Sequence, residues 1–285
     1  MHRFRGEVRR TYWEAVVTAR VTTLKGVDAG AYYVEALPSY YLDADEPPGR
    51  WHGHGADMLG LRGEVRDEGL LDIMAGVHPG SRGVLLGRAY GESSVRGFDI
   101  TANAPKSVSV LFAVGDDFVR HEALASHDAA VAAMVRWIEA HAHTRFRING
   151  EVAVVDAEGT VAAAFRQHTS RALDPHLHTQ VVVANRVRTP EGRWLALDAR
   201  TLKLDQRTLS AIYHAMLRTE LTARLGVHWE PVVNGIAEIG GIGKTVLEEF
   251  SSRTAGVARR FDEKLDRFID TMERDPTPRE RWQLE

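Results

Sequence analysis

Hydrophobic and polar positions repeat along this chain in two rhythms, one typical of helices and one typical of strands. Helical spacing predicts a helix over residues 126–142, which Ser126 would cap, and a longer helix over 205–225, which Gly226 would end. The apolar positions that share one face are Val131, Met134, Val135 and Ile138 in the first helix and Leu209, Ile212, Met216 and Leu221 in the second. Each helix therefore presents one apolar face to a core.

Stretches rich in β-branched residues predict strands around these helices. The segment "RGFDITANAPKSVSVLFAV" contains a strand, a turn at Ala104-Pro105 and a second apolar segment. The segment "EVAVVDAEGTVAAAFRQ" predicts a hairpin that turns at Glu158-Gly159. "LHTQVVVANRVR" predicts a further strand, which leads through a turn into a short one. Strands and helices mix without a regular βαβ rhythm, which favours an α+β layer fold.

Composition narrows the chemistry that this chain can perform. Its 285 residues are 44% hydrophobic and 26% charged, as expected for a globular protein with a sizeable core. Neither a membrane-spanning apolar run nor a secretory signal is found, so we expect a cytoplasmic protein. With no cysteine, any metal must be held by histidine, carboxylate or amide ligands. The net charge of -3 means that a nucleic acid would require a local basic surface.

The segment "DPHLHTQ", residues 174–180, suggests a metal site. On a strand, His176, His178 and Gln180 lie two apart and share a face, whereas Gln167 and His168 on the preceding strand face opposite ways. Imidazole nitrogens and amide oxygens are both acceptable ligands for a cation at the seam of two strands. The spacing alone also fits a solvated strand end without a metal.

Basic and aromatic residues offer candidate contacts to a nucleic acid. Six arginines gather in and around the expected sheet: Arg145, Arg147, Arg166, Arg171, Arg186 and Arg188. Such a cluster would bind phosphates with a steep salt dependence, although a solvated charged face has the same composition. Trp51 beside "HGHG" would either stack on a base or fill the core.

Several motifs together resemble those of a known family. They are "FRQHTSRALDPHLHTQVVVANRV", "FDITANAPKSVSVL", and "AYYVEALPSYYLD" followed by "WHGHGADMLGLRGEV". In this order they resemble conjugative relaxases of the TrwC/TraI (MobF) type, within the HUH endonuclease superfamily, over about residues 25–265. The resemblance implies a central antiparallel sheet flanked by helices in two layers. It also implies a relaxase domain over 25–270, an extension over 1–24, and a tail or linker over 271–285 that could lead to a helicase.

The family resemblance implies strand-specific DNA nicking at an origin of transfer. A tyrosine hydroxyl attacks a backbone phosphate and forms a 5′-phosphotyrosine, and the stored bond permits later rejoining. By position, Tyr32 is the expected first nucleophile, Tyr40 the second, and Tyr33 and Tyr41 lie beside them. Asp99 is expected to orient a metal ligand or to accept a proton. The expected DNA-binding residues are Arg171, Lys106, Arg166 and Arg186.

The metal ligands depart from the family pattern. Three histidines are usual, and the positions in register here are Gln167, His178 and Gln180, with His176 and His168 as alternatives. Amide oxygens favour Mg²⁺ or Mn²⁺ over Zn²⁺ or Cu²⁺. The expected partners are single-stranded or hairpin origin DNA, with accessory relaxosome and coupling proteins. Two rival interpretations are a relaxase-like DNA-binding module with weakened catalysis and a metal-dependent phosphodiesterase that acts on small esters.

Overall fold

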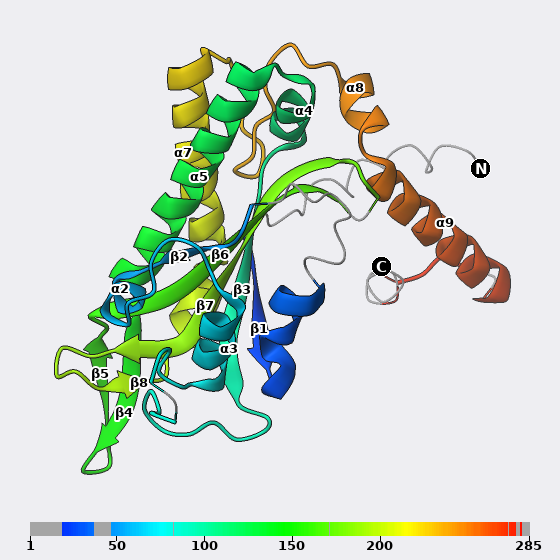
Figure 1. Ribbon diagram of the computed structural model, residues 1–285. Helices are drawn as coiled ribbons and strands as arrows, with labels where there is room; N and C mark the ends of the chain where they lie inside the picture. Colours follow the sequence, from blue (N-terminus) through cyan, green and yellow to red (C-terminus); the bar gives the residue numbers. More distant parts are fainter. Residues whose placement is uncertain are drawn as a thin grey trace.

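A central antiparallel sheet organises the molecule (Figure 1). The computed structural model describes residues 19–36, 47–81, 83–170, 172–272, 274–277 and 280. Within them the strand order is β1-β3-β7-β6-β2, and β8 pairs with β7. The bounds are β1 (Ala19–Lys25), β2 (Arg50–His52), β3 (Val95–Asn103), β6 (Gly159–Thr169), β7 (Pro175–Arg188) and β8 (Trp194–Leu195). The predicted fold class is confirmed, and the sheet begins before the predicted domain start at residue 25.

Three helices cover the back face of the sheet. They are α4 (Lys106–Val114), α5 (Asp117–Ala140) and α7 (Gln206–Leu225), of which α5 and α7 pack against each other (Figure 1). Alternate strand residues such as Ile100, Val181 and Val183 point into this layer and are buried there with Met134 and Leu217. These contacts form the main hydrophobic core. Burial of their apolar surface is the principal favourable term in folding.

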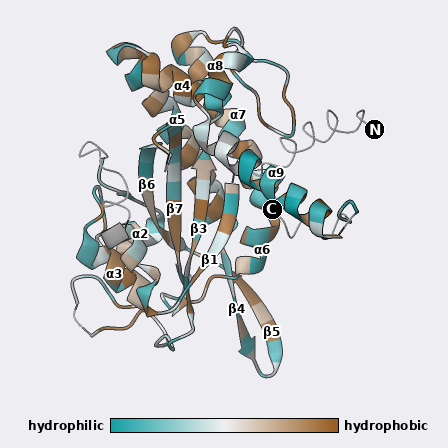
Figure 2. Ribbon diagram, turned by 90° about the vertical axis from the view of Figure 1, so that its right-hand side faces the viewer, coloured by the Kyte–Doolittle hydropathy of each residue, from teal (hydrophilic) through white to brown (hydrophobic). Residues whose placement is uncertain are grey.

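Smaller elements cover part of the opposite face, called the front face below. They are α2 (His54–Met58), α3 (Asp67–Ala75), a 3₁₀ turn η2 (Val27–Ala29) and a π-helical turn η3 (Tyr32–Ala36). Tyr33, Leu70 and Met74 from this layer pack on Phe165 and Val182 of the sheet. Figure 2 shows β6, β7, β3 and β1 in order, with α2 and α3 beside β6.

The predicted hairpin at Glu158-Gly159 is wrong. The strand β5 (Glu151–Asp156) pairs with β4 (His143–Ile148) in a separate two-stranded sheet, and β6 pairs with β7 and β2. The hairpin turn is Asn149-Gly150, whose φ angles of 52° and 89° suit a two-residue turn. Gly159 has a different role, because a Cβ there would lie 2.5 Å from the Gly55 nitrogen.

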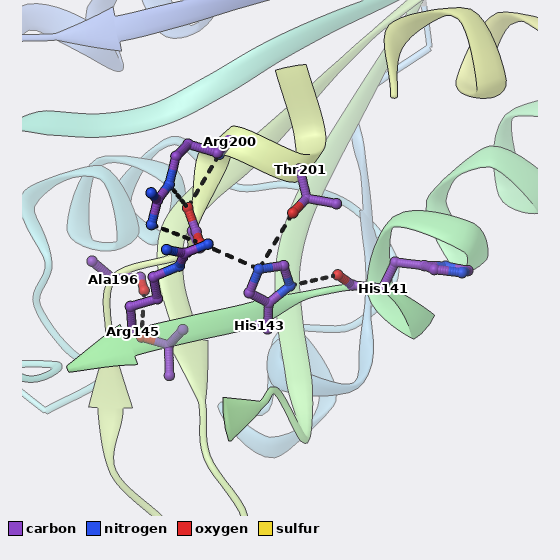
Figure 3. Close-up of polar contacts among 8 residues, drawn as sticks. His141, His143, Arg145, Ala196, Arg200 and Thr201 are labelled. Atoms are coloured by element: carbon purple, nitrogen blue, oxygen red, sulfur yellow. Dashed lines mark hydrogen bonds and ion pairs between the residues drawn. The ribbon is translucent and has the colours of Figure 1, made fainter. Parts of the chain in front are cut away.

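The two-stranded ribbon β4–β5 is tied to the helix α6 (Ala199–Leu204) by one carboxylate. Asp198 pairs with His143 Nε2 at 3.3 Å, with Arg145 and with Arg200 Nε at 3.1 Å. Figure 3 shows His143 and Arg145 of β4 facing Arg200 and Thr201 of α6, and His143 also contacts Thr201. The ribbon is therefore fixed at its base.

The predicted helices are confirmed with changes at their ends. The helix α5 begins at Asp117, nine residues before the expected start, and the Asp116 carboxylate caps it by accepting from Val119 N at 2.9 Å. Ser126 therefore lies inside the helix and donates to the Glu122 carbonyl, which corrects the predicted cap. The helix α7 ends at Gly226 as predicted, with φ at 65°. Its buried residues include Leu209, Tyr213, Leu217 and Leu221, and the predicted Ile212 and Met216 are only half-buried.

Two further helices follow, α8 (Lys244–Glu249) and α9 (Ser252–Met272). The hydroxyl of Ser252 donates to the Asp174 carboxylate at 2.8 Å, which ties the start of α9 to the loop before β7. Within the part of the chain that the structure describes, every helix is too short or too polar to cross a membrane.

Candidate metal and tyrosine site

Strand register gathers polar side chains at one place on the front face. Gln167 of β6 and Asn103 of β3 both lie directly opposite His178 of β7. Two residues along β7, Gln180 lies opposite Phe165 and Thr101 in the same way. Residues directly opposite in an antiparallel pair share a face, so the predicted ligands come together.

The orientation of His178 makes it a suitable metal ligand. Its Nδ1 lies 2.8 Å from the carbonyl oxygen of His176, and a carbonyl can only accept a hydrogen bond. The proton is therefore on Nδ1, and in the neutral ring Nε2 carries the lone pair. Metal-binding histidines are commonly oriented in this way by a backbone carbonyl.

Both glutamines at this site are short of hydrogen-bond partners. Gln167 is 0% exposed, and neither its Oε1 nor its Nε2 has a partner among the residues that the structure describes. The Oε1 of Gln180 is also buried without one. Leaving a buried polar group unsatisfied costs about 1–3 kcal/mol. A bound water or ion is one way to satisfy such buried groups, and two amide oxygens on the same face as an imidazole nitrogen fit a divalent cation.

This donor set differs from an ordinary metal site. Over the described ranges, no group of three or more His, Cys, Asp or Glu side chains could hold a metal ion. A cation on the front face would therefore depend on the amides of Gln167 and Gln180. Their oxygens favour hard cations such as Mg²⁺ and Mn²⁺.

The two alternative ligands have different positions. The ring of His176 lies 4.5 Å from the ring of His178, so it is close to the site. His168 lies at a register irregularity, and its ring packs 4.9 Å from that of Phe112 in the back layer. Burial lowers the pKa of His168 to about 4. The bulge thus leaves His168 on the back of the sheet, away from the donor set.

The tyrosine pair at the start of η3 lies over the same face. The Tyr33 ring is buried and stacks on Phe165 with 5.5 Å between centroids, and Phe165 lies directly opposite Gln180. Tyr32 is half-buried and meets the Tyr33 ring edge-on at 5.1 Å. Tyr32 is therefore the more accessible phenol of this pair. Tyr40 and Tyr41 lie outside the described residues.

Asp99 lies on the front face of β3 and is bonded to Tyr33. Burial raises the pKa of Asp99 to about 6, and the hydrogen bond from the Tyr33 hydroxyl opposes that shift. Burial, followed by the charge of Asp99, raises the pKa of Tyr33 well above its usual range. Tyr33 therefore stays protonated and holds Asp99 in place, which suits it poorly to act as the nucleophile.

The predicted DNA-binding residues have mostly internal contacts. Arg166 points to the back layer and pairs with Asp128 at 2.5 Å. Arg186 is 4% exposed, with its guanidinium 3.7 Å from the Tyr90 ring centroid, which argues against a phosphate contact. Lys106 donates to the Pro175 carbonyl at 2.8 Å and so holds the start of β7. Arg171 lies outside the described residues.

Of the other basic and aromatic candidates, some make contacts within the protein and one is exposed. Arg188 pairs with Glu158 at 2.5 Å, whereas Arg147 is exposed on the ribbon. Trp51 is half-buried and packs beside Phe165 and Val182, so it contributes to the core. It also lines cavities of about 530 and 680 Å³, so both predicted roles remain compatible with its position.

Several residues of the site were not identified in the sequence. Asn103 and Thr101 join Asp99 on the front face of β3, and Arg20 of β1 lies opposite Thr101. The alternation in "DITAN" was a usable signal, because polar residues occupy every second position and the intervening residues are buried. Arg20 could not be assigned to the site from the sequence, because no local pattern shows that β1 pairs with β3.

Comparisons with known proteins identify relatives of this chain. The model of the TrwC relaxase family matches residues 11–283. Two proteins named multifunctional conjugation protein TraI, from Escherichia coli and its strain K12, are 34% and 32% identical over 247 residues. These alignments cover 82% of this chain but only 13% of each relative, so the chain spans a small part of their length.

Solved structures of a relative also share the fold. The conjugative relaxase TrwC in complex with oriT DNA, in a metal-bound structure, is 30% identical with a TM-score of 0.75; the match covers 93% of this chain and 89% of that one. A complex of TrwC with a 27-mer DNA comprising the recognition hairpin and the cleavage site is 29% identical, with a TM-score of 0.72 and coverage of 93% and 88%. The extent of these matches, together with the site geometry, shows that this chain belongs to the TrwC relaxase family.

Proposed function

We propose that this chain nicks one DNA strand at an origin of conjugative transfer and becomes joined to it through Tyr32. The observation that carries the proposal is the convergence on one face of a tyrosine pair, Asp99 and a set of cation donors. The relatives named as conjugation proteins, and the TrwC complexes with origin DNA, support the same substrate.

The reaction that we assign is a transesterification. The Tyr32 oxygen forms a bond to phosphorus, the bond from phosphorus to the 3′ oxygen breaks, and the 3′ oxygen gains a proton while the phenol loses one. Asp99 is our candidate for the acceptor of the phenol proton, because its carboxylate lies on the same face and has a pKa of about 6. Adduct formation should therefore slow as the pH falls below about 6, because protonated Asp99 cannot accept.

A divalent cation would be held by His178, Gln167 and Gln180. The orphaned amide oxygens and the oriented imidazole are the observations that support this assignment. When bound, such a cation supplies charge to a non-bridging phosphate oxygen and aligns the phosphate. The protein contributes the position of the donors, which strand pairing fixes.

The ribbon β4–β5 is our candidate for a contact to duplex DNA. Arg145 lies opposite Val154, and Arg147 lies opposite Val152, so these four side chains share the exposed face of the ribbon. A two-stranded ribbon fits the major groove of a DNA duplex. A hairpin in the origin would offer such a duplex beside the single strand to be cut.

A covalent-capture assay tests the function. The protein is mixed with a randomised single-stranded DNA pool and Mg²⁺ or Mn²⁺, and protein–DNA adducts that survive denaturation are isolated and sequenced. We expect one preferred junction for the wild type, and no adduct with Tyr32→Phe. Tyr90→Phe is the matched control, because its hydroxyl bonds to the Asn185 carbonyl away from the site.

The alternative that the two glutamines favour is a DNA-binding module with weakened catalysis. Amide oxygens are weaker ligands than imidazole for late transition metals. Sequence-selective binding without an adduct in any divalent metal would support that alternative. Turnover of a chromogenic phosphodiester without a DNA adduct would instead support a hydrolase.

A further inference from the structure

Strand register arranges the front face of the sheet in rows that run across the strands. One row contains the cation donors His178 and Gln167, with Asn103 beside them. Another row, farther along β7, contains Asp99, which accepts from the Tyr33 hydroxyl. The row between these two consists of Arg20, Thr101, Gln180 and Phe165. Residues directly opposite one another share a face, so this middle row connects the cation donors to the tyrosine pair.

Arg20 is the only cationic side chain among the described residues of these three rows. It is exposed, and within the described part of the chain it forms no ion pair and no side-chain hydrogen bond. Adjacent strands lie about 4.8 Å apart, so the Cα atoms of Arg20 and Gln180 are separated by about 10 Å. The long side chain of Arg20 can extend over Thr101 across that interval. Its guanidinium is therefore available to an anion that lies over the middle row.

The strand that carries Arg20 is held in place. β1 pairs with β3 from Ala19 to Lys25 and forms the edge of the sheet beside it (Figure 2). The residue after Arg20, Val21, donates its backbone N–H to Gln206 Oε1 of α7 at 2.9 Å. A donor on a fixed backbone needs little rearrangement to meet a developing charge, which is the condition for effective electrostatic catalysis.

The reaction assigned above requires positive charge at this place. When the Tyr32 oxygen attacks, the phosphorus must lie between the tyrosine pair and the cation donors. The non-bridging oxygens of a phosphate carry negative charge through such a transfer, and arginine side chains are common partners for them. A guanidinium offers two parallel N–H donors to these oxygens and stays protonated throughout.

We propose that Arg20 is a further catalytic residue of this chain, which contacts the phosphate under attack and stabilises its negative charge. This inference rests on the proposed function, because it assigns a partner to a phosphate of the DNA strand that is cut. The competing partner on the same face is Asp99, whose Oδ1 is buried without a hydrogen bond among the described residues. A guanidinium that served Asp99 would act on the proton acceptor instead of on the phosphate.

A binding experiment tests the contact without cleavage. A single strand is selected from a randomised pool by its binding to Tyr32→Phe, and each phosphate in turn is replaced by a neutral methylphosphonate. We expect the replacement at the wild-type adduct junction to weaken binding to Tyr32→Phe by about tenfold or more, because a charge-assisted hydrogen bond is lost. In Tyr32→Phe/Arg20→Gln the same replacement should cost less than about threefold, because the contact is already absent. Additive losses at that phosphate would overturn the proposal.

Single-turnover kinetics at saturating DNA test the role in the chemical step. Arg20→Gln should form the adduct about 100-fold more slowly, which is the usual loss for one donor directed at developing charge. Arg20→Lys should recover part of the rate, because it keeps the charge but lacks the planar fork of donors. Lys25→Gln is the matched control, since it removes an exposed cation from the other end of β1 and should keep the wild-type rate. Equal rates for Arg20→Gln and the wild type would overturn the proposal.

The pH profile separates a contact to the phosphate from a contact to Asp99. Removal of a neighbouring positive charge raises the pKa of a carboxyl group. If Arg20 served Asp99, Arg20→Gln would move the acid limb of adduct formation to higher pH, and that result would overturn the proposal. We expect the limb to stay near pH 6, the pKa that burial gives to Asp99.

The outcomes also distinguish this inference from the proposed function. A Tyr32 adduct whose rate does not respond to Arg20→Gln would overturn the role of Arg20 and leave the function standing. Non-additivity between Arg20→Gln and one methylphosphonate, without any adduct from the wild type, would support the phosphate contact and count against nicking.

Discussion

A buried hydrogen-bond relay lies directly behind the cation donors. His127 of α5 is fully buried, with Nδ1 2.7 Å from the Tyr213 hydroxyl and Nε2 2.7 Å from the Thr179 hydroxyl. Thr179 lies between His178 and Gln180 on β7 and points to the back face. Because burial holds the pKa of His127 well below its usual range, the neutral ring donates to one hydroxyl and accepts from the other.

We predict that His127→Leu destabilises the protein by about 2–4 kcal/mol, because it leaves buried hydroxyls without partners at about 1–3 kcal/mol each. The Tyr213 hydroxyl is enclosed and should contribute its full cost. Thr179 lines the cavity of about 680 Å³, so water can partly replace its lost partner. The destabilisation should therefore stay below the sum of two full costs, one for each hydroxyl.

Urea unfolding of the wild type, His127→Leu, Tyr213→Phe and the double variant measures this effect. The two single losses should be strongly non-additive, because Tyr213→Phe removes a partner that His127→Leu has already left unsatisfied. The yield of the covalent adduct from folded His127→Leu should also fall, since β7 loses its support behind the donors. A loss below about 0.5 kcal/mol, or simple additivity, would refute the role of the relay.

Three other predictions follow from particular side chains. Asp99→Asn should raise the free energy of unfolding by about 2–3 kcal/mol at pH 7.5. Folding raises the pKa of Asp99 from 3.8 to about 6, so the folded state disfavours the charged carboxylate. The resulting loss of stability in the wild type develops between pH 4 and 6 and persists at higher pH. The same variant should slow adduct formation about 100-fold or more, and an unchanged stability in urea would contradict the burial argument. Acid should destabilise the fold below about pH 6.5. In the folded state His168 and His214 have pKa values of about 4, so as the pH falls the unfolded chain binds protons before the folded chain does. A urea midpoint that does not fall between about pH 7 and 5 would count against this assignment. Arg147→Ala should weaken hairpin DNA binding and reduce the slope of affinity against salt by about one, measured by fluorescence anisotropy, with no change expected for single strands.

The face that carries the site could be predicted from the sequence because it depends on strand alternation. Two-residue spacing placed His178 and Gln180 together, and motif order placed Gln167 on the next strand. The residues of β3 that lie beside them could not be predicted, because β3 and β7 are about 80 residues apart in the sequence, as the pair Asn103 and His178 shows. No local pattern specifies that register.

The errors have local physical causes. Gly159 was interpreted as a turn residue, but its lack of a side chain allows the backbone of Gly55 to approach closely. The residues that form the turn are Asn149 and Gly150. A cluster of arginines in the sequence does not reveal which guanidiniums are buried. Arg186 illustrates this, since its charge stacks on Tyr90 inside the protein. Whether a helicase follows residue 285 and where the domain ends remain predictions.

Anomalous diffraction at the manganese edge, from crystals of Tyr32→Phe with Mn²⁺ and the DNA strand that the capture assay identifies, tests the central claim most directly. We predict one strong peak within bonding distance of His178 Nε2 and of the Oε1 atoms of Gln167 and Gln180, with a DNA phosphate completing the site and the ring at position 32 facing its phosphorus. A peak bound elsewhere, or a ring at position 32 directed away from the phosphate, would contradict the account.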